Sequence, residues 1–106
     1  MSGVAENLAR NRLPNKRRCE TIAFEMDGSQ YRLTLGYYPS GKIGEIFLNH
    51  DRGDSLLDVL THDAAIGVSL ALQHGCSLET IRHALKRDSR GKAAPPIGEA
   101  LDRIAP

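Results

Sequence analysis

One long helix, predicted from about Leu56 to His74, constrains the fold of this chain more than any other feature. Its second half, from Ala64 to Leu72, has Ser69 as its only polar side chain. A helix that is apolar around most of its circumference needs cover on more than one side. We therefore expect a sheet to cover one side of this helix, and a second helix or a partner subunit to cover the other.

The ends of this helix are marked in the sequence. Ser55 stands three residues before Asp58, which is the capping-box spacing with Asp in place of the favoured Glu. Gly75 follows the last apolar residues and suits the left-handed conformation that often terminates a helix.

Three segments before the helix predict an antiparallel β-meander. Apolar and polar residues alternate over Glu20–Met26 and Gln30–Tyr38, and a third strand is expected over Ile43–Asn49. Asp27-Gly28 is a strong signal for a two-residue hairpin turn, since a type I′ turn needs positive φ at both positions. Pro39-Ser40-Gly41 supplies the second turn.

Two shorter helices are expected after the long one. Ser77 is a suitable N-cap for a helix from Leu78 to about Arg87. Residues 88–94 read as a flexible basic linker, and Pro95-Pro96 opens a short amphipathic C-terminal helix. The predicted fold class is α+β: a three-stranded antiparallel meander packed on a long helix, followed by a second helix and a short C-terminal helix.

The bulk composition predicts one small globular domain. The chain has 106 residues, of which 41% are hydrophobic and 25% charged, which excludes a disordered protein. We expect a basic flexible arm over residues 1–17, a domain over 18–88, and a linker with a short helix over 89–106. Without a secretory h-region or an apolar run of roughly 18 residues, the expected location is cytoplasmic and no membrane partner is expected.

Charge is distributed unevenly along the chain. Residues 1–18 carry five bases and one acid, residues 19–81 carry three bases and nine acids, and residues 82–106 carry six bases and three acids. The candidate polyanion-binding residues are the five bases of the arm: Arg10, Arg12, Lys16, Arg17 and Arg18. These bases could neutralise phosphates, although the basic ends could equally offset the acidic middle of the chain or be solvated.

No residue pattern predicts a catalytic, metal or cofactor site. His50-Asp51 and His62-Asp63 contain metal-ligating residue types, but adjacent residues on a helix point about 100° apart, and no HxxxH spacing occurs. Cys19 and Cys76 lack CxxC partners. The chain contains no nucleophile elbow, phosphate-binding loop or dinucleotide fingerprint.

Several motifs, in order, resemble the TSCPD domain. They are Arg12-Leu13-Pro14-Asn15-Lys16-Arg17-Arg18, Gly44-Glu45-Ile46-Phe47, Ser69-Leu70-Ala71-Leu72-Gln73-His74-Gly75 and the tail from Pro96 to Asp102. That domain is best known near the C-terminus of adenosylcobalamin-dependent (class II) ribonucleotide reductases, and the resemblance covers roughly residues 12–86. The Thr-Ser-Cys-Pro-Asp string that names the domain is absent, so no cysteine-based metal role carries over to Cys19 or Cys76.

The resemblance implies an accessory module related to nucleotide reduction rather than an enzyme, because the reductase barrel does not fit in this length. Our leading hypothesis is a non-catalytic, self-associating interaction domain without a cofactor, whose partner is a second copy or a ribonucleotide reductase. The candidate partner surface comprises Ala64, Gly67, Ala71, Ile97, Leu101 and Ile104. The alternative is a small nucleic-acid-binding protein that uses the basic N-terminal arm.

Overall fold

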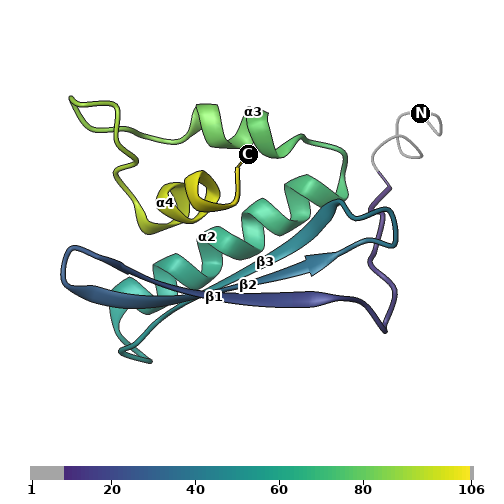
Figure 1. Cartoon of the computed structure of the whole chain (residues 1–106), viewed down its shortest axis with the longest axis horizontal. Helices are drawn as coiled ribbons and strands as arrows, with labels where there is room; N and C mark the ends of the chain where they lie inside the picture. Colours follow the sequence, from purple (N-terminus) through teal and green to yellow (C-terminus); the bar gives the residue numbers. More distant parts are fainter. Residues whose placement is uncertain (1–8, 106) are drawn as a thin grey trace.

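A three-stranded antiparallel sheet forms one layer of the protein, and three helices form the other (Figure 1). This computed structural model describes residues 9–105. The strands are β1 (Cys19–Met26), β2 (Ser29–Tyr37) and β3 (Ile43–His50), and the helices are α2 (Leu56–Gln73), α3 (Leu78–Ala84) and α4 (Pro96–Ile104). The sheet order is β1-β2-β3, so the predicted α+β meander is confirmed.

The first turn has the geometry that the sequence predicts. Asp27 and Gly28 have φ values of 52° and 79°, and Met26 pairs directly with Ser29 across the hairpin. Positive φ at both central residues is the mark of a type I′ turn, whose twist matches that of the two strands.

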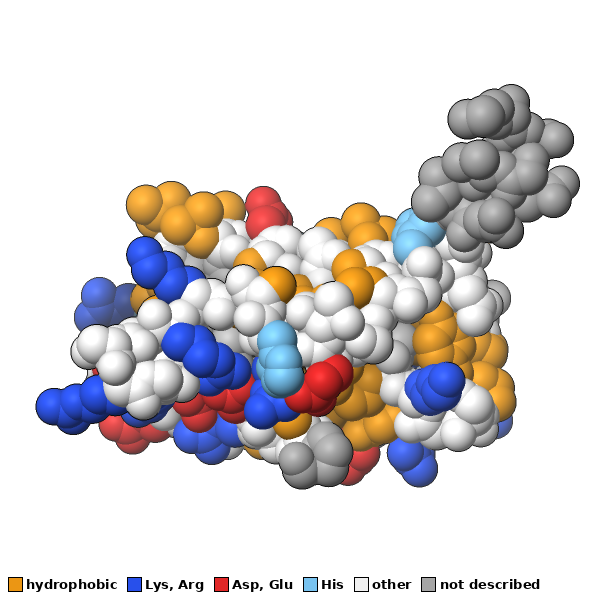
Figure 2. Space-filling view, turned by 90° about the horizontal axis from the view of Figure 1, so that it is seen from above, with side chains coloured by type: hydrophobic (Ala, Val, Ile, Leu, Met, Phe, Trp, Pro, Cys, Tyr) orange, Lys and Arg blue, Asp and Glu red, His pale blue; other side chains and the backbone are white. Residues whose placement is uncertain are grey.

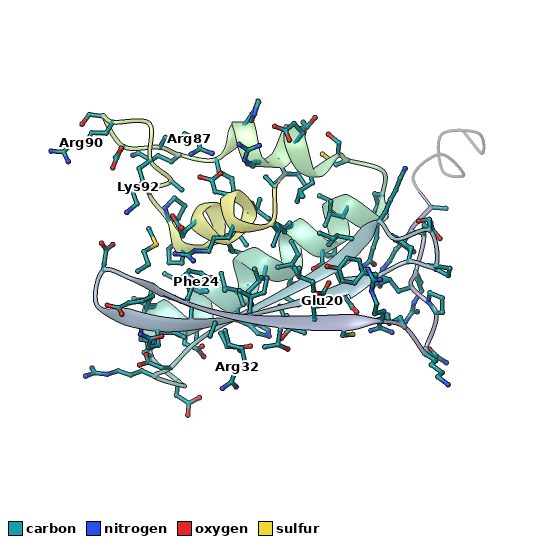
Figure 3. All side chains as sticks on the ribbon, in the orientation of Figure 1. Glu20, Phe24, Arg32, Arg87, Arg90 and Lys92 are labelled. Atoms are coloured by element: carbon teal, nitrogen blue, oxygen red, sulfur yellow. The ribbon has the colours of Figure 1, made fainter. Side chains whose placement is uncertain are left out.

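The two faces of the sheet differ in their surroundings. Phe24, Leu33 and Ile46 lie in the core between the sheet and the helices. Figure 3 shows Phe24 directed toward the helical layer and Arg32 directed away from it. Alternate residues of a strand point to opposite faces, so the second face is polar and carries exposed residues such as Thr21 and Gln30.

The long helix has the predicted ends. The Asp58 N–H donates to the Ser55 side-chain oxygen at 3.1 Å, which caps the first turn of α2. Gly75 follows the helix with φ at 95°, where a residue with a Cβ would be strained.

The segment after α3 differs from the prediction. The helix was expected to reach Arg87, but it ends at Ala84 and Leu85 is already extended. Arg87 instead pairs with Ala93 in an isolated antiparallel bridge, and the Asp88 carboxylate accepts the N–H groups of Arg90 and Lys92 at 2.9 and 3.0 Å. Hydrogen bonds in this turn replace the last helical turn, so residues 88–92 form a closed, hydrogen-bonded loop where a flexible linker was expected.

The C-terminal helix completes the hydrophobic core. Ile97, Ala100 and Leu101 are buried among the sheet residues and α2, and the Arg103 guanidinium covers the Phe24 ring at 4.8 Å. Helix α4 is therefore part of the same folding unit, which extends beyond the boundary expected at residue 88.

Candidate interaction surfaces

Helix α2 lies along the outer edge of β3 and binds its backbone through polar side chains. The His50 N–H donates to the Asp58 carboxylate at 2.9 Å, and the Gln73 side-chain NH₂ donates to the Gly44 carbonyl at 2.9 Å. Ser69 serves the middle of the strand, where its oxygen accepts the Ile46 N–H at 2.8 Å and lies 2.9 Å from the Ile46 carbonyl. These contacts satisfy backbone groups that an edge strand would otherwise leave unpaired.

This arrangement leaves the apolar side chains of α2 on its outer face. The large exposed hydrophobic residues of the described chain all lie on this helix, and we call them the α2 apolar face: Leu56, Leu57, Val59, Leu60, Ile66 and Leu70. Leu56 is 74% exposed and Leu60 is 59% exposed. By length and composition alone α2 could cross a membrane, but here its polar side packs on β3. Exposed large hydrophobic side chains gathered on one helix are typical of an interaction site.

The structure divides the predicted partner residues into two groups. Gly67 is exposed and has open space where a Cβ would lie, and Ala64 and Ala71 are half-buried beside it. The prediction is wrong for Ile97 and Leu101, which are only 7% and 0% exposed because α4 turns them into the core. Ile104 is half-buried against the same core.

The described part of the basic arm contacts the end of the sheet where β2, β3 and α2 meet. Arg17 forms an ion pair with the buried Glu45 carboxylate, and a second hydrogen bond to the same carboxylate measures 3.1 Å. That ion pair raises the pKa of the Arg17 guanidinium. Arg10 donates to the Gln73 side chain, while the Asn11 N–H donates to the Gln73 carbonyl at 2.8 Å.

Two glycines make room for this contact. A Cβ on Gly44 would lie 2.5 Å from the Tyr38 ring and 3.0 Å from the Leu13 side chain, and a Cβ on Gly36 would lie 2.2 Å from the Glu45 carboxylate. Three of the four segments that carry the family resemblance therefore meet at one end of the molecule, where they hold the arm to the domain.

The arm and the β2–β3 turn together form a basic surface, which we call the basic groove. Two adjoining hollows of about 240 and 550 Å³ share Tyr38 and Pro39. The cations along them are Arg12, Lys16, Arg17, Arg18 and Lys42. Lys42, on the turn, joins the arm residues only in the folded chain, and no motif in the sequence signals this proximity.

The two tyrosines of the basic groove remain protonated at neutral pH. A hydrogen bond to Glu20 raises the pKa of Tyr37, with burial adding to the shift. Burial raises the pKa of Tyr38, whose hydroxyl donates to the Asn11 carbonyl. The Arg18 guanidinium lies 4.3 Å from the centre of the Tyr37 ring, so both rings already have partners within the chain.

The histidines and cysteines do not form a metal cluster within residues 9–105. His50 is buried at the end of β3, where its Nδ1 accepts the Arg52 N–H at 3.0 Å, whereas His62 is exposed on α2. Cys19 and Cys76 are both exposed free thiols.

An ionic cluster between α3, the following loop and α4 was not predicted. Asp102 accepts hydrogen bonds from Arg87 at 2.8 and 2.9 Å and from Arg82 at 2.9 Å. The bonds from Arg87, more than those from Arg82, lower the pKa of Asp102 to about 2. Arg82, Arg87 and Asp102 are not part of one sequence motif. They come together only in the folded chain, where α4 packs beside the end of α3.

Curated proteins similar to this chain are large reductases. The vitamin B12-dependent ribonucleotide reductases of Streptantibioticus cattleyicolor and Streptomyces clavuligerus are each 37% identical to it over 71 residues, which is 67% of this chain and 12% and 7% of those proteins. The corresponding protein of Rhodopirellula baltica is 33% identical over 72 residues, or 68% of this chain and 7% of its own length. No known protein family profile and no solved structure matches the chain. The chain thus spans only 7 to 12% of the length of these relatives, as a small accessory domain such as TSCPD would.

Proposed function

We propose that this homologue of a short segment of vitamin B12-dependent ribonucleotide reductases is a non-catalytic interaction domain that self-associates through the α2 apolar face. Its second partner in this proposal is a reductase of that class. The observation that carries the proposal is the exposure of six large hydrophobic side chains on a single helix. Exposure of several large hydrophobic side chains on one helix, here around the charged Asp63, is unfavourable in water unless another protein covers them.

The α2 apolar face suits a second copy of itself. Most homodimers are isologous, so that the same patch on both subunits must be self-complementary. An antiparallel pairing of two α2 helices places Leu60 of one copy near Leu70 of the other, with the exposed Gly67 allowing close approach between them. Antiparallel helices also oppose their dipoles favourably.

The proposed absence of catalysis rests on the size of the matched segment. The similarity covers 7 to 12% of each of the three reductases named above.

Light scattering coupled to size exclusion tests self-association. The wild-type chain is expected to form dimers, and Leu60→Asp is expected to shift it to monomers because a charge would be buried in the interface. Ala84→Asp places the same charge at an exposed site on α3 and should leave the dimer intact. A wild-type chain that stays monomeric at high concentration would contradict the proposal.

A binding measurement with a purified vitamin B12-dependent ribonucleotide reductase tests the second partner. Biolayer interferometry should detect binding of the immobilised wild-type chain and a loss of at least tenfold in affinity for Leu60→Asp, which corresponds to about 1.4 kcal/mol. Absence of binding to the reductase would remove this partner while leaving self-association to stand on the light-scattering result.

A further inference from the structure

We propose that the basic groove binds the phosphodiester backbone of single-stranded nucleic acid without sequence preference. This inference is independent of the α2 apolar face, because it rests on the opposite kind of surface. It requires cations without internal partners that can contact phosphates, hollows beside them, and little surface suited to contacting bases. The described residues meet each of these requirements.

Three cations of the basic groove are uncommitted. Arg12, Lys16 and Lys42 are exposed, and within the described chain their side chains make no hydrogen bond or ion pair. The buried Glu45 carboxylate, which lies at this end of the sheet, is already paired with Arg17. The field of the groove is therefore positive, and an anion need not displace an internal partner to bind there.

The β2–β3 turn gives the groove a fixed wall. The Tyr38 N–H donates to the Lys42 carbonyl, and the Gly41 N–H donates to the Tyr38 carbonyl, both at 2.9 Å. Lys42 thus stands at a constant position across the hollow from the arm, which the Arg17–Glu45 pair and the Gln73 contacts hold in place. Cations spread along an open hollow suit a chain of phosphates better than a single compact anion.

The chemistry of the groove favours the backbone over the bases. Proteins that hold single strands by their bases stack them on exposed aromatic rings. Here the Tyr38 ring packs against Gly44, and the Tyr37 ring lies under the Arg18 guanidinium. With neither ring free as a platform, binding depends on phosphate neutralisation and therefore on salt.

A charge-matched pair of triple variants tests the site. The first is Arg12→Ala/Lys16→Ala/Lys42→Ala, and the second is Lys86→Ala/Arg90→Ala/Lys92→Ala. The control residues are exposed and belong to the end of α3 and its loop, where Lys and Arg side chains gather at the left of Figure 2 and where Figure 3 labels Arg90 and Lys92. Both variants lose three positive charges, and circular dichroism verifies their folding.

Fluorescence anisotropy with a labelled oligothymidylate measures binding at about 50 mM salt and over a salt series. We expect the groove variant to bind roughly tenfold or more weakly and its slope of log K against log salt to fall by about 2, since each lost contact with a single strand contributes about 0.7. The control variant should stay within roughly threefold of the wild type.

Three results would overturn the inference. The wild-type chain could fail to bind the oligomer at low salt, or both variants could lose affinity equally, which would reflect net charge alone. Tighter binding of ATP or inorganic triphosphate than of the oligomer, with displacement of the oligomer, would assign the groove to a free polyphosphate instead.

Discussion

Gly44 is the residue on which the docking of the arm depends most directly. It has no side chain at the point where the Tyr38 ring and Leu13 cross the start of β3. The ring is rigid and its hydroxyl is held by Asn11, so it cannot move aside without releasing the arm. Glycine is needed here for its lack of volume, because its φ lies in the ordinary range for any residue.

We predict that Gly44→Ala lowers the free energy of unfolding by about 1–3 kcal/mol, because the added methyl group overpacks the contact with Tyr38. Gly53→Ala is the matched control, since nothing lies within 4 Å of the Cβ it would add, and a change below about 0.5 kcal/mol is expected. Urea denaturation measures both variants. If both substitutions changed the free energy of unfolding equally, overpacking against Tyr38 would not be the cause of the loss.

The ion pairs of Asp102 make the free energy of unfolding depend on pH in the acidic range. The pKa of Asp102 is lowered to about 2 in the folded chain, so the unfolded chain binds this proton more readily. The stability that Asp102 contributes is therefore complete above its unfolded pKa of about 3.9 and is lost as pH falls toward 2.

We predict that Asp102→Asn costs on the order of 1 kcal/mol at neutral pH, discounted because a quarter of the Asp102 side chain is exposed and solvent screens its charge. The difference between variant and wild type should shrink between roughly pH 4 and pH 2. Denaturation curves at several pH values measure this, with the exposed Asp54→Asn as control. A difference that stays constant down to pH 2 would exclude the ion pairs as its cause.

At the scale of elements, the contact between α2 and the edge of β3 is made by polar side chains. Ser69 is 6% exposed and Gln73 is 3% exposed, and both side chains bond to the β3 backbone. A buried N–H left without a partner costs the desolvation of that group. The hydrogen-bonding capacity of these side chains therefore matters more here than their small apolar area.

We predict that Ser69→Ala lowers the free energy of unfolding by about 1–3 kcal/mol, because the Ile46 N–H loses its acceptor. Hydrogen exchange at the Ile46 amide should accelerate selectively, which a general loss of packing would not produce. Ser89→Ala, at an exposed position in the α3–α4 loop, serves as control. An Ile46 amide that remains as protected as in the wild type would contradict the role of Ser69.

The positions of the helices and strands were largely predictable from the sequence, but the side of each helix that packs against the sheet was not. Alternation and turn residues located the three strands, and Ser55 and Gly75 located α2. The sequence predicted that a sheet covers one side of α2 but did not show which side, and in the structure Ser69 and Gln73 face β3. Periodicity shows only which residues share a side of a helix. It does not show that the unpaired backbone groups of an edge strand will bond to the polar side. For α4, amphipathicity alone could not tell core from docking surface.

At the scale of the whole molecule, the two candidate surfaces have opposite chemistry. The α2 apolar face carries leucine, valine and isoleucine, and the basic groove carries arginine and lysine. Salt is expected to affect them in opposite ways, since it screens phosphate binding and does not weaken apolar association.

We predict that the melting temperature of the wild-type chain rises with protein concentration, because association of folded copies stabilises them by mass action. Leu60→Asp should melt at a temperature independent of concentration. Differential scanning fluorimetry over a concentration series measures both. A concentration-independent wild-type melting temperature would argue against folded-state association.

The cover that α2 provides for β3 limits how sheets of this protein can join. The opposite edge strand, β1, hydrogen-bonds to β2 on one side and has no such cover within the described chain. Edge-to-edge contact between copies can use only this strand, and once two β1 strands meet, the helices bound to each β3 stop further addition. Growth of a continuous sheet would therefore end at two molecules, and an open-ended fibril built from native sheets is excluded by geometry.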